Sequence, residues 1–169
     1  MLHQLVVVQF QKSLSNLSKI LDKGLNYAEQ KKIDPSVLLN ARLAPDQFPL
    51  VRQVRICCDT AKLGVARLAG KDAPVQEDKE TSIPELKARI ESTSSYLKSM
   101  SVKDLNEASQ RKVTTPRWEG RYLLGHEYAT EHVVPNFYFH LTTAYSILRH
   151  NGVDIGKKDF LGDLSFKNP

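Results

Sequence analysis

The stretch of sequence that decides the fold is VRQVRICCDTAKLGVARLAG, from Val51 to Gly70. Its apolar residues recur at alternating steps of three and four: Val51, Val54, Cys58, Ala61, Val65 and Leu68. Steps of this size put side chains on one face of an α-helix, so the stretch predicts an amphipathic helix. Charged residues occupy the opposite face: Arg52, Arg55, Asp59 and Lys62. Gly70 stands where a left-handed residue commonly ends a helix.

Two segments on either side show the same periodicity. Upstream, the spaced apolar residues predict a helix from about Leu2 to Lys31: Phe10, Leu14, Leu17, Leu21, Leu25 and Ala28. Downstream, Ser82 followed by Glu85 is a capping-box pattern, and it begins a helix predicted to end near Met100. Residues 71–81 (KDAPVQEDKET) show no apolar periodicity and predict a solvated loop.

A fourth long helix is predicted near the C-terminus from Val133, Phe137, His140, Ala144 and Ile147. Pro135 disfavours helical geometry at the residue before it, so this helix is expected to start or kink there. Before the helix, Val113–Trp118 and Arg121–Leu124 flank a Glu-Gly turn and predict a small β-ribbon.

Four amphipathic helices predict an all-α protein, an antiparallel four-helix bundle in which residues 1–169 form one domain. A short helix is expected over Pro35–Arg42, and an irregular tail is expected from Val153 to Pro169. The composition agrees with a globular domain, since 41% of the 169 residues are hydrophobic and 25% are charged.

Charge and composition also restrict the expected partners. The net charge is +5, but the basic residues occur as isolated doublets, so no nucleic-acid binding is expected. The aliphatic run Leu5–Val8 is too short for a signal-peptide core or a membrane span. The adjacent Cys57 and Cys58 are poorly suited to a disulfide. A cytoplasmic protein without a membrane partner is therefore expected.

The histidine spacing does not encode a local metal site. The last four histidines are separated by six, eight and ten residues: His126, His132, His140 and His150. Two ligands on one helix need a spacing of three or four to meet at one ion. On a helix, His132 and His140 would lie about 12 Å apart, which is too far to share a metal.

His140 is the histidine on the predicted apolar stripe, and Asn136 precedes it by one helical turn. Its interpretation stays open between a hydrogen-bonded core residue and a pocket residue that acts as acid, base or ligand donor. Gln53 falls beside the stripe of its own helix and reaches either the interior or the surface. Tyr145 and Arg149 are one turn apart. Arg149 either binds an anion or pairs with an acid such as Asp159 to hold the tail.

Familiar catalytic patterns are missing from the sequence. There is no Gly-x-Gly-x-x-Gly, P-loop, Gly-x-Ser-x-Gly or His-Glu-x-x-His motif, which removes the readily recognised nucleotide-binding, hydrolase and zincin classes. Cys57 and Cys58 fall in the middle of a predicted helix, where no helix dipole activates a thiolate, and a structural role is favoured for them.

Two stretches resemble a known family: ARLAPDQFPLVRQVRICCDTAK (Ala41–Lys62) and PNFYFHLTTAYSILRHNGVDIGKKDFLG (Pro135–Gly162). They are similar to an uncharacterised family within the DinB/YfiT-like superfamily, and the resemblance extends over nearly the whole chain. It implies a four-helix bundle, usually dimeric, with a pocket between helices. In better-understood members three histidines hold a divalent metal, one on the second helix and a His-x-x-x-His pair on the fourth. Some of those members are thiol-dependent transferases or isomerases.

The sequence departs from that ligand pattern. His140 is the only candidate remnant ligand, because Ala144 stands four residues later and the second helix has no histidine. No cofactor is expected, and zinc or nickel would require substitute ligands.

The expected function is that of a small-molecule-binding bundle. Its pocket candidates are His140, Asn136, Tyr145, Gln53 and Arg149. One alternative is a metal- or thiol-dependent transferase or hydrolase with substitute ligands, and another is a structural dimer that binds a protein partner. Whether the chain is an enzyme stays open. A homodimer is expected from the resemblance and from apolar residues on the first helix outside its main stripe: Leu5, Val6, Val7 and Ile20.

Overall fold

The protein, seen here in a computed structural model that describes residues 1–167, is mainly helical. Helix α1 (Gln9–Lys31) continues from a π-helical turn (Gln4–Val8), so one long helix spans the region predicted for it. The apolar stripe of α1 is buried except at Leu25, which packs partly buried against the same core. Lys32, in the left-handed conformation, ends the helix.

The second and third long helices are α3 (Leu50–Ala69) and α4 (Ile83–Lys98). Gly70 has a φ of 65°, a conformation that glycine adopts without steric cost, and it ends α3 as predicted. At the start of α4, the Ser82 backbone N–H donates to Glu85 Oε2 over 3.0 Å and the Ser82 hydroxyl accepts from the Glu85 N–H. The predicted capping box is confirmed.

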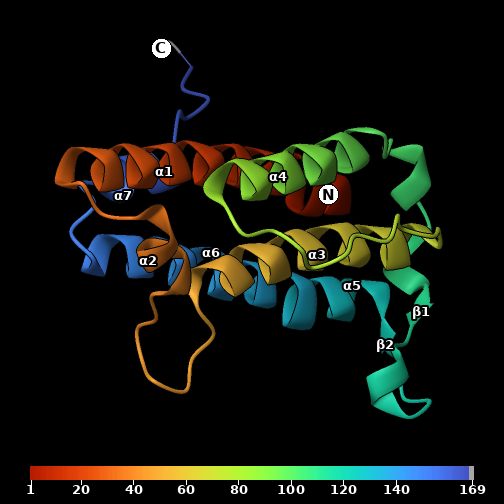
Figure 1. The fold of residues 1–169 in the computed structure, drawn as a ribbon. Helices are drawn as coiled ribbons and strands as arrows, with labels where there is room; N and C mark the ends of the chain where they lie inside the picture. Colours follow the sequence, from red (N-terminus) through yellow and green to blue (C-terminus); the bar gives the residue numbers. More distant parts are fainter. Residues whose placement is uncertain (168–169) are drawn as a thin grey trace.

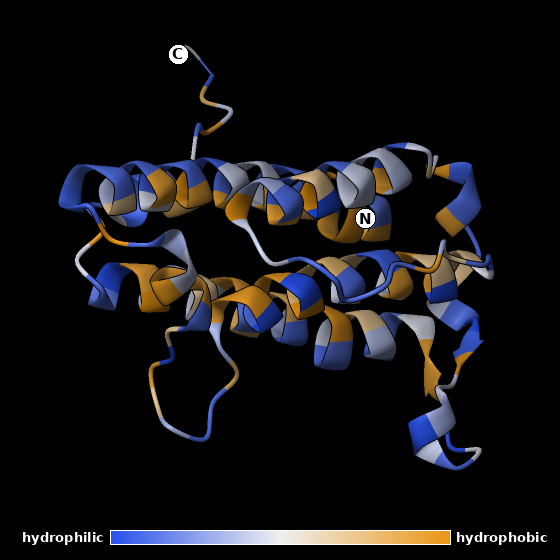
Figure 2. Cartoon of the chain, in the orientation of Figure 1, coloured by the Kyte–Doolittle hydropathy of each residue, from blue (hydrophilic) through white to orange (hydrophobic). Residues whose placement is uncertain are grey.

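The four long helices form two layers, with α1 beside α4 in one layer and α3 beside α6 (Val134–His150) in the other (Figure 1). The predicted four-helix bundle is confirmed. Hydrophobic residues follow stripes along the helices (Figure 2), and they form one core between the layers. Helices α3 and α4 run in the same direction, because the segment that joins them crosses back along the bundle (Figure 1).

That crossing segment, residues 71–82, is a largely exposed loop, as predicted, and polar contacts also anchor it to the helices. Fully extended, its twelve residues reach about 40 Å, enough to return along α3, which is about 30 Å long. Tyr96 donates a hydrogen bond to the Asp72 carbonyl at one end. Lys62 donates to Gln76 in the middle and Arg55 to Glu80 at the other end. The segment has no apolar periodicity because polar contacts fix it to the helices.

The strongest of these anchors is Arg89 on α4, whose side chain is 1% exposed. Its guanidinium lies 2.8 Å from Asp59 of α3, 2.9 Å from Glu80 and 3.1 Å from Asp78. Burial removes the water that stabilises a cation, and carboxylates must replace it. A buried arginine therefore requires partners of this kind. We call Arg89 and its three carboxylates the Arg89 cluster.

The last long helix begins earlier than predicted. Helix α5 (Gly125–Glu127), a π-helical turn (Tyr128–Val133, the π turn) and α6 follow one another without a break. Pro135 therefore lies within a helix rather than at its start. A proline ring clashes with the carbonyl four residues before it, and the wider π turn directly upstream relieves that clash.

Short elements close the two ends of the bundle. The predicted β-ribbon is present but smaller, as β1 (Lys112–Val113) pairs antiparallel with β2 (Leu123–Leu124). Between the strands, Pro116–Trp118 forms a 3-10 turn instead of extended chain, and two further 3-10 turns (Lys103–Leu105 and Ala108–Gln110) precede β1. At the other end is α2 (Pro35–Asn40), capped by Asp34.

The tail contains a short helix that the sequence analysis missed. Helix α7 (Lys157–Leu161) packs on α1, where Lys23 and Asp159 form an ion pair of 2.7 Å. The tail was predicted to run to Pro169, and its last two residues lie outside the described residues. Within residues 1–167, every helix is too short or too polar to cross a membrane.

The apolar residues that suggested a homodimer are mostly used within the chain. Val6, Val7 and Ile20 are at most 2% exposed, and Leu5 is partly buried against the same core. They leave no free apolar face on α1, so the expectation of a homodimer rests on the family resemblance alone.

Candidate functional site

Three polar side-chain contacts join α3 to the helix that faces it, at successive levels along the bundle. The residues from α3 are seven apart: Gln53, Thr60 and Arg67. Their partners, in the same order, are His140, Asn136 and Tyr128. The bonds measure 2.7, 2.7 and 3.1 Å. Seven residues are close to two helical turns, so the three α3 residues share one face.

The first level is buried and closed. The Gln53 side-chain N–H donates to the Phe48 carbonyl over 3.0 Å, which leaves the Gln53 oxygen facing His140. Since that oxygen only accepts, the His140 Nδ1 carries the proton. Burial lowers the pKa of His140, which favours the neutral ring. The predicted pocket residues Gln53 and His140 therefore satisfy each other in the interior.

These residues do not fit the three-histidine metal site that the family resemblance implies. The His140 Nδ1 is protonated and bonded, the Gln53 oxygen is occupied, and the buried Ala144 offers no donor one turn further. Among residues 1–167, no group of three or more His, Cys, Asp or Glu side chains is arranged to hold a metal ion.

Tyr145 and Arg149, also predicted for the pocket, hold the tail. The Tyr145 hydroxyl donates to the Ile155 carbonyl over 3.5 Å, and Arg149 donates to the Val153 carbonyl over 3.4 Å. The Arg149–Asp159 ion pair considered from the sequence is not formed, because Asp159 pairs with Lys23 of α1 instead.

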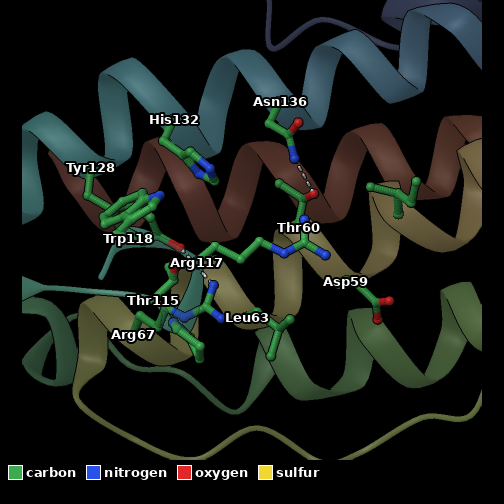
Figure 3. A pocket seen from close by; sticks show the side chains of 12 residues that line it. Asp59, Thr60, Leu63, Arg67, Thr115, Arg117, Trp118, Tyr128, His132 and Asn136 are labelled. Carbon is green, nitrogen blue, oxygen red and sulfur yellow. Dashed lines mark hydrogen bonds between the residues drawn. The ribbon is translucent and has the colours of Figure 1, made fainter. Parts of the chain in front are cut away.

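The second and third levels open into a cavity of about 350 Å³. Its walls come from α3, from the 115–118 segment and from the π turn with the start of α6 (Figure 3). Asn136 is the one predicted pocket residue that lines it. The other lining residues are Ile56, Asp59, Thr60, Leu63, Arg67, Thr115, Pro116, Arg117, Trp118, Tyr128 and His132.

One wall of the cavity is aromatic. The rings of Tyr128 and His132 stack with centroids 5.4 Å apart, and the Trp118 ring meets both edge-on at 5.9 and 5.5 Å. The His132 Nδ1 is buried and has no hydrogen-bond partner among residues 1–167. Burial, followed by the nearby charge of Arg67, lowers the pKa of His132.

The cavity also holds cationic groups that the fold does not neutralise. Arg67 donates to the Tyr128 hydroxyl, and Arg117 extends from the 115–118 segment toward Thr60 (Figure 3). Neither guanidinium forms an ion pair with a carboxylate of residues 1–167. The ion pairs within these residues are formed by other lysine and arginine side chains. The Asp59 carboxylate at the edge is already paired with Arg89 at 2.8 Å and with Lys62 at 3.4 Å.

A glycine sets the spacing of these walls. Gly64 lies in α3 between Thr60 and Arg67, and a Cβ there would be 2.5 Å from Cγ1 of Val133. Only glycine lets the π turn approach α3 this closely. The close approach brings Tyr128 within hydrogen-bond distance of Arg67.

The comparisons with known proteins agree with this fold. The family model "Domain of unknown function (DUF1993)" matches residues 2–161. The chain belongs to this family. Together with the structural match below, this membership confirms the predicted resemblance to an uncharacterised DinB-like family.

A crystal structure described as a DinB family member protein from Shewanella denitrificans is 56% identical to this DUF1993 chain. The match covers 100% of this chain and 96% of that chain, with a TM-score of 0.97. Among curated proteins, none matches. The family description assigns no activity, so functional inference depends on the site itself.

Proposed function

We propose that this DUF1993 protein is a small-molecule-binding helical bundle whose ligand occupies the cavity between α3, the π turn and the 115–118 segment. The observation that carries the proposal is the set of polar groups there that the fold leaves unused. The His132 Nδ1 has no partner and Arg117 forms no ion pair within residues 1–167. Buried polar atoms are almost always hydrogen-bonded, so an orphan beside a cavity indicates a missing partner.

The dimensions and lining of the cavity support the same proposal. Small-molecule sites typically measure about 300–1,000 Å³ and combine apolar or aromatic walls with a few polar groups. At about 350 Å³ this cavity falls in the lower part of that range. Trp118 provides flat apolar surface backed by the buried Tyr128 ring, while Thr60 and Asn136 provide hydrogen-bonding groups.

This proposal moves the pocket one helical turn along α6 from the position expected around His140. Asn136 belongs to both positions, whereas the polar groups of His140 and Gln53 are paired with each other. A metal- or thiol-dependent transferase or hydrolase would need a donor set or reactive thiol at the cavity. Its lining has neither a cysteine nor more than one histidine. We therefore propose ligand binding as the function of this cavity.

The single tryptophan makes the proposal testable. Because Trp118 lies in the cavity wall, a ligand there should change its fluorescence. A set of neutral, anionic and cationic aromatic fragments would be titrated into the protein. We expect at least one saturable change in emission. If none of the fragments causes a saturable change, the proposal is wrong.

A cavity-filling variant provides the control for position. Asn136→Phe adds a ring at the cavity wall and should abolish the fluorescence response. Thr142→Phe adds the same ring at an exposed position of the same helix and should leave the response unchanged. Equal responses in the two variants would locate the bound fragment elsewhere.

A further inference from the structure

We infer that the ligand is an oxyanion, a carboxylate or a phosphate, carried on an aromatic ring. This inference rests on the proposed function and names its substrate class. The polar part of the cavity predicts the charge of the ligand, and the aromatic wall predicts its shape. Tyr128 is the residue that both parts share, since its hydroxyl bonds Arg67 and its ring belongs to the aromatic wall.

The charge follows from the balance of ionised groups at the cavity. Arg67 and Arg117 contribute two guanidinium groups without a carboxylate partner among the described residues. The single lining carboxylate, Asp59, is shared with Arg89 and Lys62, so its negative charge is largely committed outside the cavity. The cavity is therefore left with an excess of positive charge, which attracts an anion.

Guanidinium groups also select the type of anion. Their planar N–H donors match the oxygens of a carboxylate or phosphate, and the match is poor for a spherical ion such as chloride. The Tyr128 hydroxyl accepts one Arg67 hydrogen bond over 3.1 Å and so orients that guanidinium before a ligand arrives. A donor oriented in advance loses less entropy on binding, which raises affinity.

The ring follows from the aromatic wall. Trp118 and His132 are partly exposed there and pack on the buried Tyr128 ring, with centroid separations of 5.4–5.9 Å. Aromatic rings prefer offset-stacked or edge-to-face neighbours at such distances. The His132 Nδ1 in this wall is buried and has no hydrogen-bond partner among residues 1–167. A ligand with only an anionic group would leave the aromatic wall uncovered.

The test compares four probes by Trp118 fluorescence at constant ionic strength: benzoate, phenylphosphate, benzyl alcohol and inorganic phosphate. We expect benzoate or phenylphosphate to bind at least about tenfold more tightly than benzyl alcohol, since charge-assisted hydrogen bonds are roughly twice as strong as neutral ones. Inorganic phosphate, which lacks the ring, should bind more weakly than phenylphosphate. The order of benzoate and phenylphosphate identifies which oxyanion the cavity prefers.

Arg117→Gln tests the charge without endangering the fold, because Arg117 is exposed and forms no ion pair with residues 1–167. It should weaken the preferred anion about tenfold and leave benzyl alcohol unchanged. Arg52→Gln removes the same charge from an exposed position of α3 away from the cavity and should change neither affinity.

The outcomes separate this inference from the proposal beneath it. If benzyl alcohol binds as well as benzoate and phenylphosphate, and Arg117→Gln has no effect, the cavity binds ligands but the oxyanion is wrong. If a cationic fragment binds most tightly, the inference is overturned in the same way. If no aromatic fragment of any charge binds, the proposed function fails as well.

Discussion

Arg89 and Arg67 both reach inward from long helices, yet their surroundings are opposite. Arg89 is 1% exposed and lies within 3.1 Å of three carboxylates. Arg67 is half-buried at a cavity, and its side-chain hydrogen bond within residues 1–167 goes to a neutral tyrosine hydroxyl. The first cation holds the 71–82 segment against α3 and α4. The second remains available, because nothing in residues 1–167 neutralises it.

The difference shows how function can be located when no reaction is known. Polar groups that the fold itself pairs, such as the two terminal guanidinium nitrogens of Arg89 or the Gln53–His140 pair, indicate structural roles. Polar groups left over beside a cavity indicate a partner outside the chain. Burial of a histidine or an arginine does not by itself distinguish a structural role from a binding role. The hydrogen-bond partners of the side chain do distinguish them.

The largest effect is expected from Arg89→Met. The change removes the buried cation that Asp59, Asp78 and Glu80 share, and breaking a buried ion pair typically costs about 3–5 kcal/mol. Because Lys62 still pairs with Asp59 and Arg55 with Glu80, we expect a loss near the lower end of that range. Arg67→Gln should reduce the free energy of unfolding by only about 1 kcal/mol, the value of one hydrogen bond. Urea denaturation of both variants measures the contrast. Similar losses in the two would mean that the arginines do not differ in role.

A smaller effect is expected along the ladder of contacts between α3 and α6. Gln53→Leu leaves the buried His140 N–H without a partner, which should cost about 1–3 kcal/mol. Thr60→Val removes the partner of Asn136, but Asn136 is partly exposed and can bond water instead. Its loss should stay below about 1 kcal/mol. Thermal denaturation compares the two, and a larger loss in Thr60→Val would contradict the assignment of the closed and open levels.

The fold was predictable from the sequence to the extent that local patterns determine it. The periodicity of α3, its glycine end at Gly70 and the Ser82–Glu85 capping box each involve residues within one or two helical turns. Helix α7 was missed because its five residues are too few to show a period. The π turn was missed because a proline such as Pro135 normally indicates a helix boundary, and the sequence shows no sign of the wider turn that allows the helix to continue through it.

The cavity was less predictable. A signal existed in the seven-residue spacing of Gln53, Thr60 and Arg67, which places three polar residues on one face of α3. Their partners on the facing helix, and the side chains of Arg117 and Trp118 across the cavity, meet α3 only through tertiary packing. No local sequence pattern predicts that these side chains lie around one cavity. His140 drew attention because it lies on an apolar stripe, whereas the histidine with an unused nitrogen is His132.

Acid should weaken the Arg89 cluster in a defined direction. Although burial raises the pKa of Glu80, its hydrogen bond to Arg89 and the charges of Arg89 and Arg55 hold that pKa below the ordinary value of 4.5. Stability from this group is therefore present above about pH 4.5 and is lost as the pH falls through the lower value in the folded protein. Urea denaturation between pH 6 and 3 should show a steeper decline in the native protein than in Glu80→Gln. Equal slopes would show that this carboxylate does not link folding to acid.

The smallest effect is expected from Tyr128→Phe. It removes the hydroxyl that orients Arg67 but keeps the ring in the aromatic wall. Affinity for the preferred aromatic oxyanion should fall only a few-fold, since Arg67 keeps its charge and loses only its orientation. The free energy of unfolding should change by less than about 1.5 kcal/mol. Fluorescence titration measures the first quantity, and an unchanged affinity would show that Tyr128 does not position Arg67 for the ligand.

The π turn makes the orientation of the residues before it depend on a single extra residue in the helix. Its closing bond runs from the Val134 N–H to the Ala129 carbonyl, one residue further than an α-helix would use. Deleting one codon between 128 and 133 would let ordinary helix continue and turn everything before it by about 100°. Tyr128 would leave Arg67, while α6 and the core would stay where they are. Gene duplicates that differ by this single residue would thus share a bundle and diverge in what they bind.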